Sequence, residues 1–426
     1  MGEAVKKIVI IGGGAAGLMA AVAAAREMGE TSYNITVVEK NSRPARKVMI
    51  TGKGRCNVTN NCDLNSLIAN TPKNGKFLYS AFSNFGAADT MQFFEDRGVP
   101  LKTERGNRVF PVSDKAVDIV DALTRAVLKI GNIIEGTAEC IMAPGGVVTA
   151  VKLTDGKILD ADCVIVATGG VSYPLTGSTG DGYKMAKSLG HTVTNLTPSL
   201  VGLECHEGFC TRLAGLSLKN VTLSVFEDGK KKALYKELGE MLFTHTGISG
   251  PLTLSASAHL RYMGKKQYFA EIDLKPALDD TQLDKRLLRD FEESLNRDFA
   301  NSLDKLLPKS IIPVIINMSG IEPHTKVNTI SREQRLKLVD IIKHFKLTIT
   351  GFRPIEEAII TSGGIAVKEI DPKTMMSKLI DGLFFAGEVI DVDAYTGGFN
   401  LQIAFSTGVL AGENAAKYKI STERKI

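Results

Sequence analysis

A run of glycines near the start of the chain has the spacing of a nucleotide-binding turn. It reads Gly-x-Gly-x-x-Gly and lies between a β-branched segment, 7–11, and an Ala-rich segment, 18–28. At this spacing the glycines permit a tight turn, close approach of the backbone to a diphosphate and close packing of the following helix. The N–H groups and the positive dipole at the start of that helix favour a bound anion. The residues predicted to hold the diphosphate are Gly12, Gly14, Ala15, Ala16 and Gly17.

An acidic residue follows at the position expected for ribose recognition. Glu39 ends the β-branched segment 35–39, 25 residues after Gly14. A carboxylate there accepts hydrogen bonds from both ribose hydroxyls and repels a 2′-phosphate. We therefore predict that Glu39 and its neighbour Lys40 belong to a dinucleotide site.

A second glycine-rich segment lies near the other end of the chain. Its glycines let the backbone approach a ligand, and a helix beginning near Asn400 would direct its N–H groups at the N1–C2=O edge of a flavin, which stabilises the anionic reduced form. Because no second strand–GxGxxG–helix unit is present to hold a nicotinamide nucleotide, we predict that the bound dinucleotide is FAD. The residues predicted to contact it here are Gly387, Glu388, Gly398, Phe399, Asn400, Leu401 and Gln402.

The elements that must position these residues are those of a doubly wound α/β fold. Short apolar strands are expected at 7–11, 35–39, 163–167 and 382–388, and helices at 18–28, 114–129 and from Leu401 onward. Asp155-Gly156 is a turn signal between two further strands, 151–153 and 157–159. Strands that alternate with helices in this way predict a mainly parallel sheet.

The middle of the chain has a different pattern. Apolar and polar residues alternate over 221–225, which predicts antiparallel strands. Apolar residues then recur every four positions over 283–299, which predicts an amphipathic helix, and 331–345 opens with a capping-box spacing of Ser and Gln and predicts another. The predicted division is an FAD-binding domain in two parts, 1–194 and 351–426, a β-rich subdomain at 195–275 and a helical subdomain at 276–350.

Composition and charge exclude several classes of protein. The chain of 426 residues is 44% hydrophobic and 23% charged, so we expect two or three folded domains. A net charge of +5 without a run of five like charges disfavours a nucleic-acid partner. The longest apolar stretch, 18–25, is shorter than the roughly 20 residues that span a bilayer, and we identify no signal peptide. Six cysteines do not form a disulfide framework in a chain of this length, which predicts a cytoplasmic protein.

Several blocks along the whole chain resemble one flavoprotein family. They are 8–17, 46–60, 167–170 with 173–182, 243–251, 361–364 and 386–408, and the most specific is the Thr-Gly-x-Gly-Arg-Cys-Asn run at 51–57. In these blocks the chain resembles the aminoacetone-oxidase-like or BaiN-like NAD(P)/FAD-dependent oxidoreductases. The resemblance implies a glutathione-reductase-type FAD domain interrupted by a β-barrel and a helical part. It also implies that the loops 51–57 and 398–402 line the flavin.

The remaining residues predicted to bind the cofactor lie in these blocks. They are Lys47, Thr51, Gly52, Gly54, Arg55, Cys56, Asn57, Thr168, Gly169 and Gly170. Arg55 could pair with an anionic group of flavin or substrate through its planar guanidinium, or it could form a structural salt bridge. Cys56 and Cys62 approach the spacing of flavin-coupled dithiols, although the family block needs only Cys56.

No catalytic residue is assigned from the sequence. The two cysteines and the histidine within 205–210 lack a second cluster at ligand spacing, so no metal site is predicted. His245, between two threonines, could move protons at a substrate or only stabilise its loop. Tyr173 and Tyr395 adjoin glycine-rich loops, and either could cap the flavin ring or donate a proton.

Together these features predict an FAD-dependent oxidoreductase. FAD is expected to bind noncovalently and to exchange a hydride with a small organic substrate at flavin N5. The favoured reaction is reduction of an unsaturated carbonyl compound of enone or steroid type, with NADH or NADPH as a transient electron donor. The alternatives are an oxygen-using oxidase of a small amine or amino ketone and an FAD-containing nucleic-acid-modifying protein. Because members of the resembled family carry out both steroid reduction and amino-ketone oxidation, the resemblance does not fix the substrate.

Overall fold

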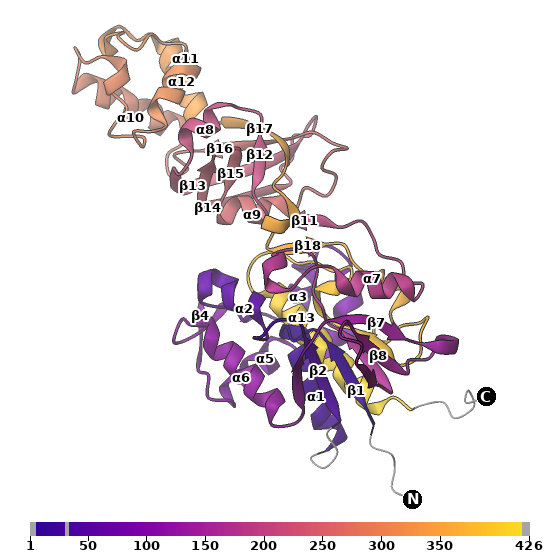
Figure 1. Ribbon diagram of the computed structural model, residues 1–426. Helices are drawn as coiled ribbons and strands as arrows, with labels where there is room; N and C mark the ends of the chain where they lie inside the picture. Colours follow the sequence, from indigo (N-terminus) through magenta and orange to yellow (C-terminus); the bar gives the residue numbers. More distant parts are fainter. Residues whose placement is uncertain (1–5, 30–33, 420–426) are drawn as a thin grey trace, which may run out of the picture. The chain divides into compact units, whose positions relative to one another are not determined.

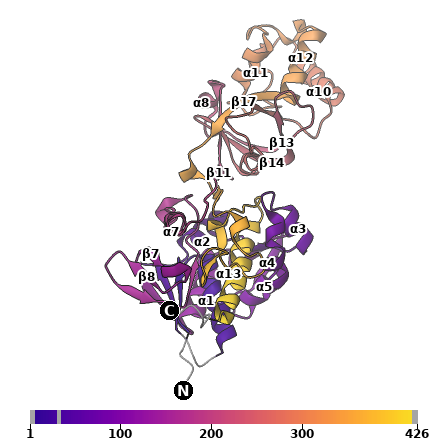
Figure 2. The same ribbon diagram turned by 90° about the vertical axis from the view of Figure 1, so that its right-hand side faces the viewer.

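The computed structural model describes residues 6–29 and 34–419, which form two compact units (Figures 1 and 2). Unit 1 contains the described residues up to Ser199 and from Ala358, and unit 2 is Leu200–Glu357. Each unit has its own hydrophobic core. Among the helices of the described residues, none combines the length and the apolar character that crossing a membrane requires.

A five-stranded parallel sheet forms the centre of unit 1. Its strand order is β19 (Leu383–Phe385), β10 (Cys163–Val166), β1 (Ile8–Ile11), β2 (Ile35–Glu39) and β6 (Asn132–Glu135). The inner strands are buried almost throughout. Their β-branched residues suit a parallel sheet that is covered on both faces.

Two helices rich in small residues pack closely beside this sheet. α1 (Ala15–Met28) and α13 (Phe399–Lys417) contact one another along their length (Figures 1 and 2). A side chain on Gly408 would overlap the carbonyl oxygen of Ala16, and one on Gly412 would overlap that of Ala20. Because both residue numbers rise together from the first pair to the second, the helices are parallel. Their N-termini therefore point to the same end of the sheet, the end at which its strands terminate.

The other elements of unit 1 surround these layers. They are α2 (Arg46–Ile50), β3 (Thr59–Asn60), α3 (Leu64–Ala69), α4 (Tyr79–Asn84), α5 (Ala87–Glu95), β4 (Leu101–Glu104), β5 (Arg108–Pro111), α6 (Ala116–Leu128), β7 (Ala138–Met142), β8 (Ala150–Leu153), β9 (Ile158–Asp160), α7 (Asp181–Ser188), β11 (Thr197–Ser199) and β18 (Ile360–Ser362). β8 and β9 pair as the hairpin predicted from Asp155-Gly156.

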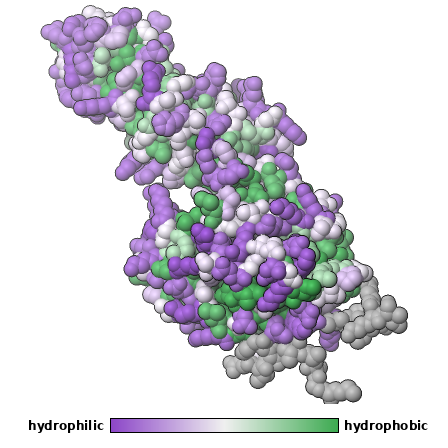
Figure 3. Space-filling view, viewed as in Figure 1, coloured by the Kyte–Doolittle hydropathy of each residue, from purple (hydrophilic) through white to green (hydrophobic). Residues whose placement is uncertain are grey.

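Unit 2 consists of a closed barrel and a group of helices. The barrel order is β12 (Leu203–Cys205), β15 (Gly247–Ser249), β14 (Tyr235–Thr244), β13 (Ser217–Glu227), β16 (Tyr268–Asp273) and β17 (Phe345–Phe352). α8 (Phe209–Leu213) and α9 (Pro251–Ser257) pack on the barrel, and α10 (Asp280–Glu292), α11 (Ile312–Ser319) and α12 (Arg332–Lys343) form the helical part. Figure 3 shows hydrophilic residues over much of this helical part, with hydrophobic residues among them, and most of its apolar side chains are buried in the core of unit 2. The predicted α/β fold class with an inserted barrel and helices is confirmed.

Two predicted helices end earlier than expected. The helix predicted over 283–299 stops at Glu292, because the chain turns there and buries Phe299 in a separate 3₁₀ turn, while Leu295 remains 52% exposed. The helix predicted over 331–345 stops at Lys343, because Phe345 begins a barrel strand paired with β16. Its predicted N-cap is confirmed: the Ser331 hydroxyl accepts the N–H of Gln334 at 3.1 Å.

Candidate functional site

The three glycines of the N-terminal turn have different structural roles. Gly12 has a φ of +106°, and a Cβ there would lie 2.5 Å from the carbonyl oxygen of Ala167. A Cβ on Gly17 would overlap the carbonyl oxygen of Gly12. Gly14 has an ordinary φ of −81°, and no atom lies within 4 Å of the position of its Cβ. Gly12 and Gly17 are thus required by the fold, whereas Gly14 keeps a space open beside the helix.

That open space adjoins the N-terminus of α1. The helix has no acidic residue in its first turn, and the earliest amide that bonds within it is that of Leu18, to the Gly14 carbonyl at 3.0 Å. The amides of Ala15, Ala16 and Gly17 are left without an acceptor among the described residues. Free N–H groups at the positive end of a helix dipole form an anion-binding site.

Glu39 is held beside the same turn. Its carboxylate is buried, and one oxygen accepts the Gly13 amide at 2.8 Å while the other accepts the Asn41 backbone and side-chain N–H groups at 2.8 and 2.7 Å. The oxygen that accepts only the Gly13 amide, Oε2, keeps capacity for a further hydrogen bond. Lys40 is directed elsewhere, because its ammonium donates to Asp181 of α7 at 2.7 Å.

The N-terminus of α13 forms the second half of the arrangement. Gly398 caps it with a φ of +100°, and a Cβ there would overlap the Thr59 backbone. The Asn400 side chain fixes the preceding loop by donating to the Ala394 carbonyl at 2.9 Å and accepting the Ala394 amide at 3.0 Å. The side chain of Gln402 is fully buried and bonds to Thr59 at 2.6 Å, so only its backbone faces the loop.

The spacing of the two helix ends follows from their packing. Gly408 of α13 lies against Ala16 of α1. α13 begins nine residues before Gly408, whereas α1 begins one residue before Ala16, so α13 extends eight residues further at its N-terminus. At about 1.5 Å per residue the α13 N-terminus extends about 12 Å beyond that of α1. Two positive helix ends therefore face the same way, offset from one another by about 12 Å along the helix axes.

Two buried polar atoms in this region have no hydrogen-bond partner. They are Oδ1 of Asn57 and Oγ1 of Thr168, both among the predicted cofactor-binding residues. Burying such an atom unpaired costs about 1–3 kcal/mol. Asn57 Oδ1 is also 3.0 Å from the position of a Cβ on Gly398, which places it at the start of α13. These residues fit a cofactor that carries hydroxyl and amide groups.

A polar network joins Lys47 to Glu388. The ammonium of Lys47 donates to Glu388 at 2.7 Å and to the Ser172 hydroxyl at 2.7 Å, and Glu388 also accepts the Thr361 amide at 2.8 Å. A Cβ on Gly170 would overlap the Thr361 hydroxyl, so this position requires glycine. The sequence analysis did not single out Ser172, and Thr361 was named only within a block of family resemblance.

In and beside the loop 51–57, Arg55 is paired with carboxylates and the two cysteines have raised pKa values. Arg55 forms ion pairs with Glu104 at 2.5 Å and with Asp114 at 2.6 Å. The structural salt bridge that the sequence suggested for Arg55 is therefore present. Its hydrogen bond to Glu104 raises the pKa of Arg55. Burial raises the pKa of Cys56 to about 12 and that of Cys62 to about 11, and both are free thiols. High pKa values disfavour the thiolate that disulfide exchange needs.

The other residues considered from the sequence are dispersed. His245 lies in unit 2 on the exposed turn between β14 and β15, where its carbonyl accepts the Thr211 hydroxyl at 2.8 Å. Tyr173 has a φ of +50° in a loop of unit 1, and the amide of Tyr395 donates to the Asn70 carbonyl at 3.0 Å. Over the part of the chain that the structure describes, no group of three or more Cys, His, Asp and Glu side chains could hold a metal ion.

Comparison with known proteins identifies the relatives of this chain. A model of the HI0933-like protein Rossmann domain matches residues 6–414. The 3-dehydro-bile acid delta(4,6)-reductase of Clostridium scindens is 32% identical over 96% of this chain and 99% of its own. The ribosomal RNA dihydrouridine synthase of Haemophilus influenzae is 31% identical over 94% and 96%. The solved 3-ketosteroid-delta4-(5alpha)-dehydrogenase of Rhodococcus jostii shares the fold, with a TM-score of 0.53, 15% identity and 96% coverage of each chain.

Proposed function

Because this chain belongs to the HI0933-like protein family and is an FAD-dependent oxidoreductase, we propose that it reduces a carbon–carbon double bond conjugated to a carbonyl group. The observation that carries this proposal is a chemical feature common to two relatives. The double bonds of a 3-dehydro-delta(4,6) bile acid are conjugated to its keto group. The uracil double bond that is saturated in dihydrouridine is conjugated to a ring carbonyl. In both substrates a hydride can add to a carbon that is conjugated to a carbonyl group.

The geometry of unit 1 supports a site for FAD that spans both helix ends. The amides at the start of α1 would hold the diphosphate, Glu39 the adenosine ribose, and the start of α13 the flavin ring. When bound, FAD supplies the hydride donor and acceptor, flavin N5, that no amino-acid side chain provides. The unpaired side-chain oxygens of Asn57 and Thr168 would accept hydrogen bonds from hydroxyl or N–H groups of the cofactor.

The protein contributes fixed positive charge to this site. The α13 N-terminus carries partial positive charge that stabilises an anion. Lys47 forms an ion pair with Glu388 at 2.7 Å, which adds oriented charges without net charge, and its ammonium also donates to the Ser172 hydroxyl at 2.7 Å. Such preorganised groups stabilise charge without rearranging during a reaction.

The electron donor and the direction of the reaction are tested with the purified FAD-loaded protein. We expect NADH or NADPH to bleach the visible flavin band in anaerobic stopped-flow experiments. A simple enone added without oxygen should then restore the colour. Failure of both nucleotides would contradict a nicotinamide donor. Bleaching by an amino ketone, followed by recolouring with oxygen only, would identify the oxidase alternative instead.

A second candidate substrate is a uracil base within ribosomal RNA, and one surface of unit 2 favours it. The turn between β13 and β14 carries three consecutive exposed lysines, Lys230, Lys231 and Lys232. On the adjoining strands the rings of Phe226 and Phe269 stack with centroids 5.1 Å apart. Cationic and aromatic side chains together are typical of single-stranded nucleic-acid binding.

This candidate is separated from the first by salt-dependent binding. We expect the affinity for a ribosomal RNA fragment to fall steeply with salt, and replacing the three lysines of the turn by glutamine to reduce that slope by about three units. Lys184→Gln with Lys187→Gln, in unit 1, is the control. If the triple variant binds RNA as well as the unchanged protein and keeps enone reductase activity, RNA is excluded as the ligand of this surface and the small-molecule proposal stands.

A further inference from the structure

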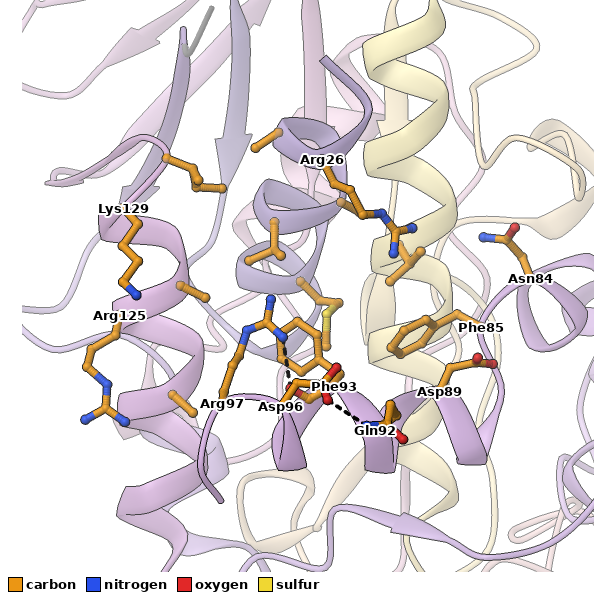
Figure 4. Close-up of a pocket in the computed structure, with 18 of the residues that line it drawn as sticks. Arg26, Asn84, Phe85, Asp89, Gln92, Phe93, Asp96, Arg97, Arg125 and Lys129 are labelled. Atoms are coloured by element: carbon orange, nitrogen blue, oxygen red, sulfur yellow. Dashed lines mark hydrogen bonds between the residues drawn. The ribbon is translucent and has the colours of Figure 1, made fainter. Parts of the chain in front are cut away.

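A groove of about 970 Å³ opens on unit 1, away from the proposed FAD site. It is bounded by α1, the end of α4, α5, α6 and the side of α13, and Figure 4 shows the side chains that line it. Its wall on α1 runs from Met19 to Arg26, toward the C-terminal end of that helix. At about 1.5 Å per residue, Arg26 lies about 16 Å along the axis from Ala15. The groove is therefore a separate cavity.

Part of the groove lining is apolar, and we call this part its floor. Its residues include Met19, Val22, Ala23, Phe85, Ile130 and Val409. The volume lies within the range of about 300–1,000 Å³ that is usual for small-molecule sites. A floor of this kind favours a hydrocarbon group over a hydrated ion.

Arg97 lies in the groove and is held by aromatic and backbone contacts. Its guanidinium lies 3.7 Å from the centroid of the Phe93 ring, and one of its N–H groups donates to the Phe93 carbonyl at 2.9 Å. It hydrogen-bonds to no carboxylate of the described residues. Burial lowers the pKa of Arg97, and the charge of Arg26 lowers it further, against the opposing effect of Asp96. The attraction of Asp96 is the larger of the two charge effects on Arg97, and Arg26 adds a smaller repulsion.

The carboxylates near these arginines already have partners. Glu413, on α13, pairs with Arg26 and also accepts the Asn84 amide at 2.9 Å. Asp89 accepts the Gly86 amide at the start of α5 at 2.8 Å, and Asp96 accepts the side-chain amide of Gln92 at 2.6 Å. These three carboxylates therefore already accept hydrogen bonds from other groups of the protein.

Two further cations line the side of the groove formed by α6. They are Arg125 and Lys129, both exposed. Figure 4 shows them on α6, with Arg97 beside Phe93 and Arg26 over α1. Four cations and two acids therefore line the cavity, and most N–H groups of Arg97 remain available.

We propose that this groove binds an amphipathic anion, with its oxyanion head at Arg26 and Arg97 and its hydrocarbon body on the apolar floor. A carboxylate or a phosphate monoester accepts paired hydrogen bonds from the planar guanidinium group. An anion between the two arginines would also replace their repulsion by attraction. The oxyanion head group defines the proposed class of ligand. The apolar floor should favour this class over inorganic anions, which have no hydrocarbon body.

Calorimetric titration of the FAD-loaded full chain tests the proposal. The probes are decanoate, decyl phosphate, inorganic phosphate and decanol, each below its aggregation limit. We expect decanoate or decyl phosphate to bind at least about tenfold more tightly than inorganic phosphate and decanol, and comparison of the first two identifies the preferred head group. Equal affinity for decanol and decanoate, or for inorganic and decyl phosphate, would overturn the proposal.

Variants locate the site. Arg97→Gln should weaken binding of the better probe by about tenfold or more, because a charge-assisted hydrogen bond is lost. Ala126→Leu, which keeps every charge and reduces the space in the groove, should weaken it as well. Arg289→Gln, an exposed arginine of unit 2, is the control. The flavin content of all three proteins should be unchanged. Unchanged affinity in both groove variants would refute the assignment.

Discussion

Replacing Gly14 by valine separates cofactor binding from folding. The residue caps α1 with φ −81° and ψ −172°, values that valine also adopts, and no atom lies within 4 Å of the position of its Cβ. The new side chain therefore meets no protein atom close to its Cβ. It fills only the space in which we place the diphosphate, next to the free amides of α1.

The expected magnitude follows from the hydrogen bonds that the valine would prevent. A hydrogen bond to a charged group contributes about 1.5–3 kcal/mol, so losing two at the diphosphate costs about 3–6 kcal/mol. This corresponds to an increase of about 10²- to 10⁴-fold in the Kd for FAD. Loss of the N-cap glycine costs the folded protein only about 1 kcal/mol, which lowers Tm by a few degrees.

The assay is a titration of FAD-stripped protein followed by quenching of flavin fluorescence, with circular dichroism to monitor the fold. Gly208→Val is the matched control, because Gly208 also caps a helix and has no atom within 4 Å of its Cβ position. The control should bind FAD as the unchanged protein does. If the Gly14→Val protein is folded and binds FAD with unaltered affinity, the diphosphate does not lie at the start of α1.

Three further predictions concern folding and reactivity. Gly408→Val should destabilise the protein by about 1–3 kcal/mol in urea unfolding, because its side chain would overlap the Ala16 carbonyl and separate α1 from α13; equal stability would contradict the close packing. Cys56 and Cys62, with pKa values of about 12 and 11, should react with a disulfide reagent at neutral pH much more slowly than a small free thiol, and rapid labelling of either in folded protein would show that it is not buried as described. Burial lowers the pKa of His259 to about 4, with a smaller effect of Arg261, so the folded state keeps it neutral while the unfolded chain binds a proton below about pH 6.5. Stability should therefore fall as pH decreases from about 6.5 to 4, by up to about 3 kcal/mol, and His259→Phe should reduce that slope.

Local chemistry made the cofactor half of the site predictable. The glycines at 12 and 17 are required by backbone geometry within a few residues, the glycine at 14 leaves a space open beside them, and the segments around them alternate as strand and helix. Helix N-termini follow from the same local signals, so the starts of α1 and α13 were predicted to within a few residues. The assignment of individual residues to FAD stays a prediction.

Periodicity alone misplaced the end of one helix. The repeat of apolar residues continues past Glu292 to Phe299, but the chain turns between them. A spacing of four residues is compatible both with a continuous helix and with separate segments that bury their apolar residues in one core. Only packing distinguishes these two arrangements.

The sequence by itself determined that a glycine-rich turn at a helix start, an acidic residue after the next strand and a second helix N-terminus exist, because each depends on neighbouring residues. Tertiary structure decided where long side chains point. It turned Lys40 to Asp181, buried Gln402 against Thr59 and paired Lys47 with Glu388, 341 residues away. It also assembled the cationic groove from five separate helices. These contacts depend on which distant segments pack together, and no periodicity or short motif encodes that.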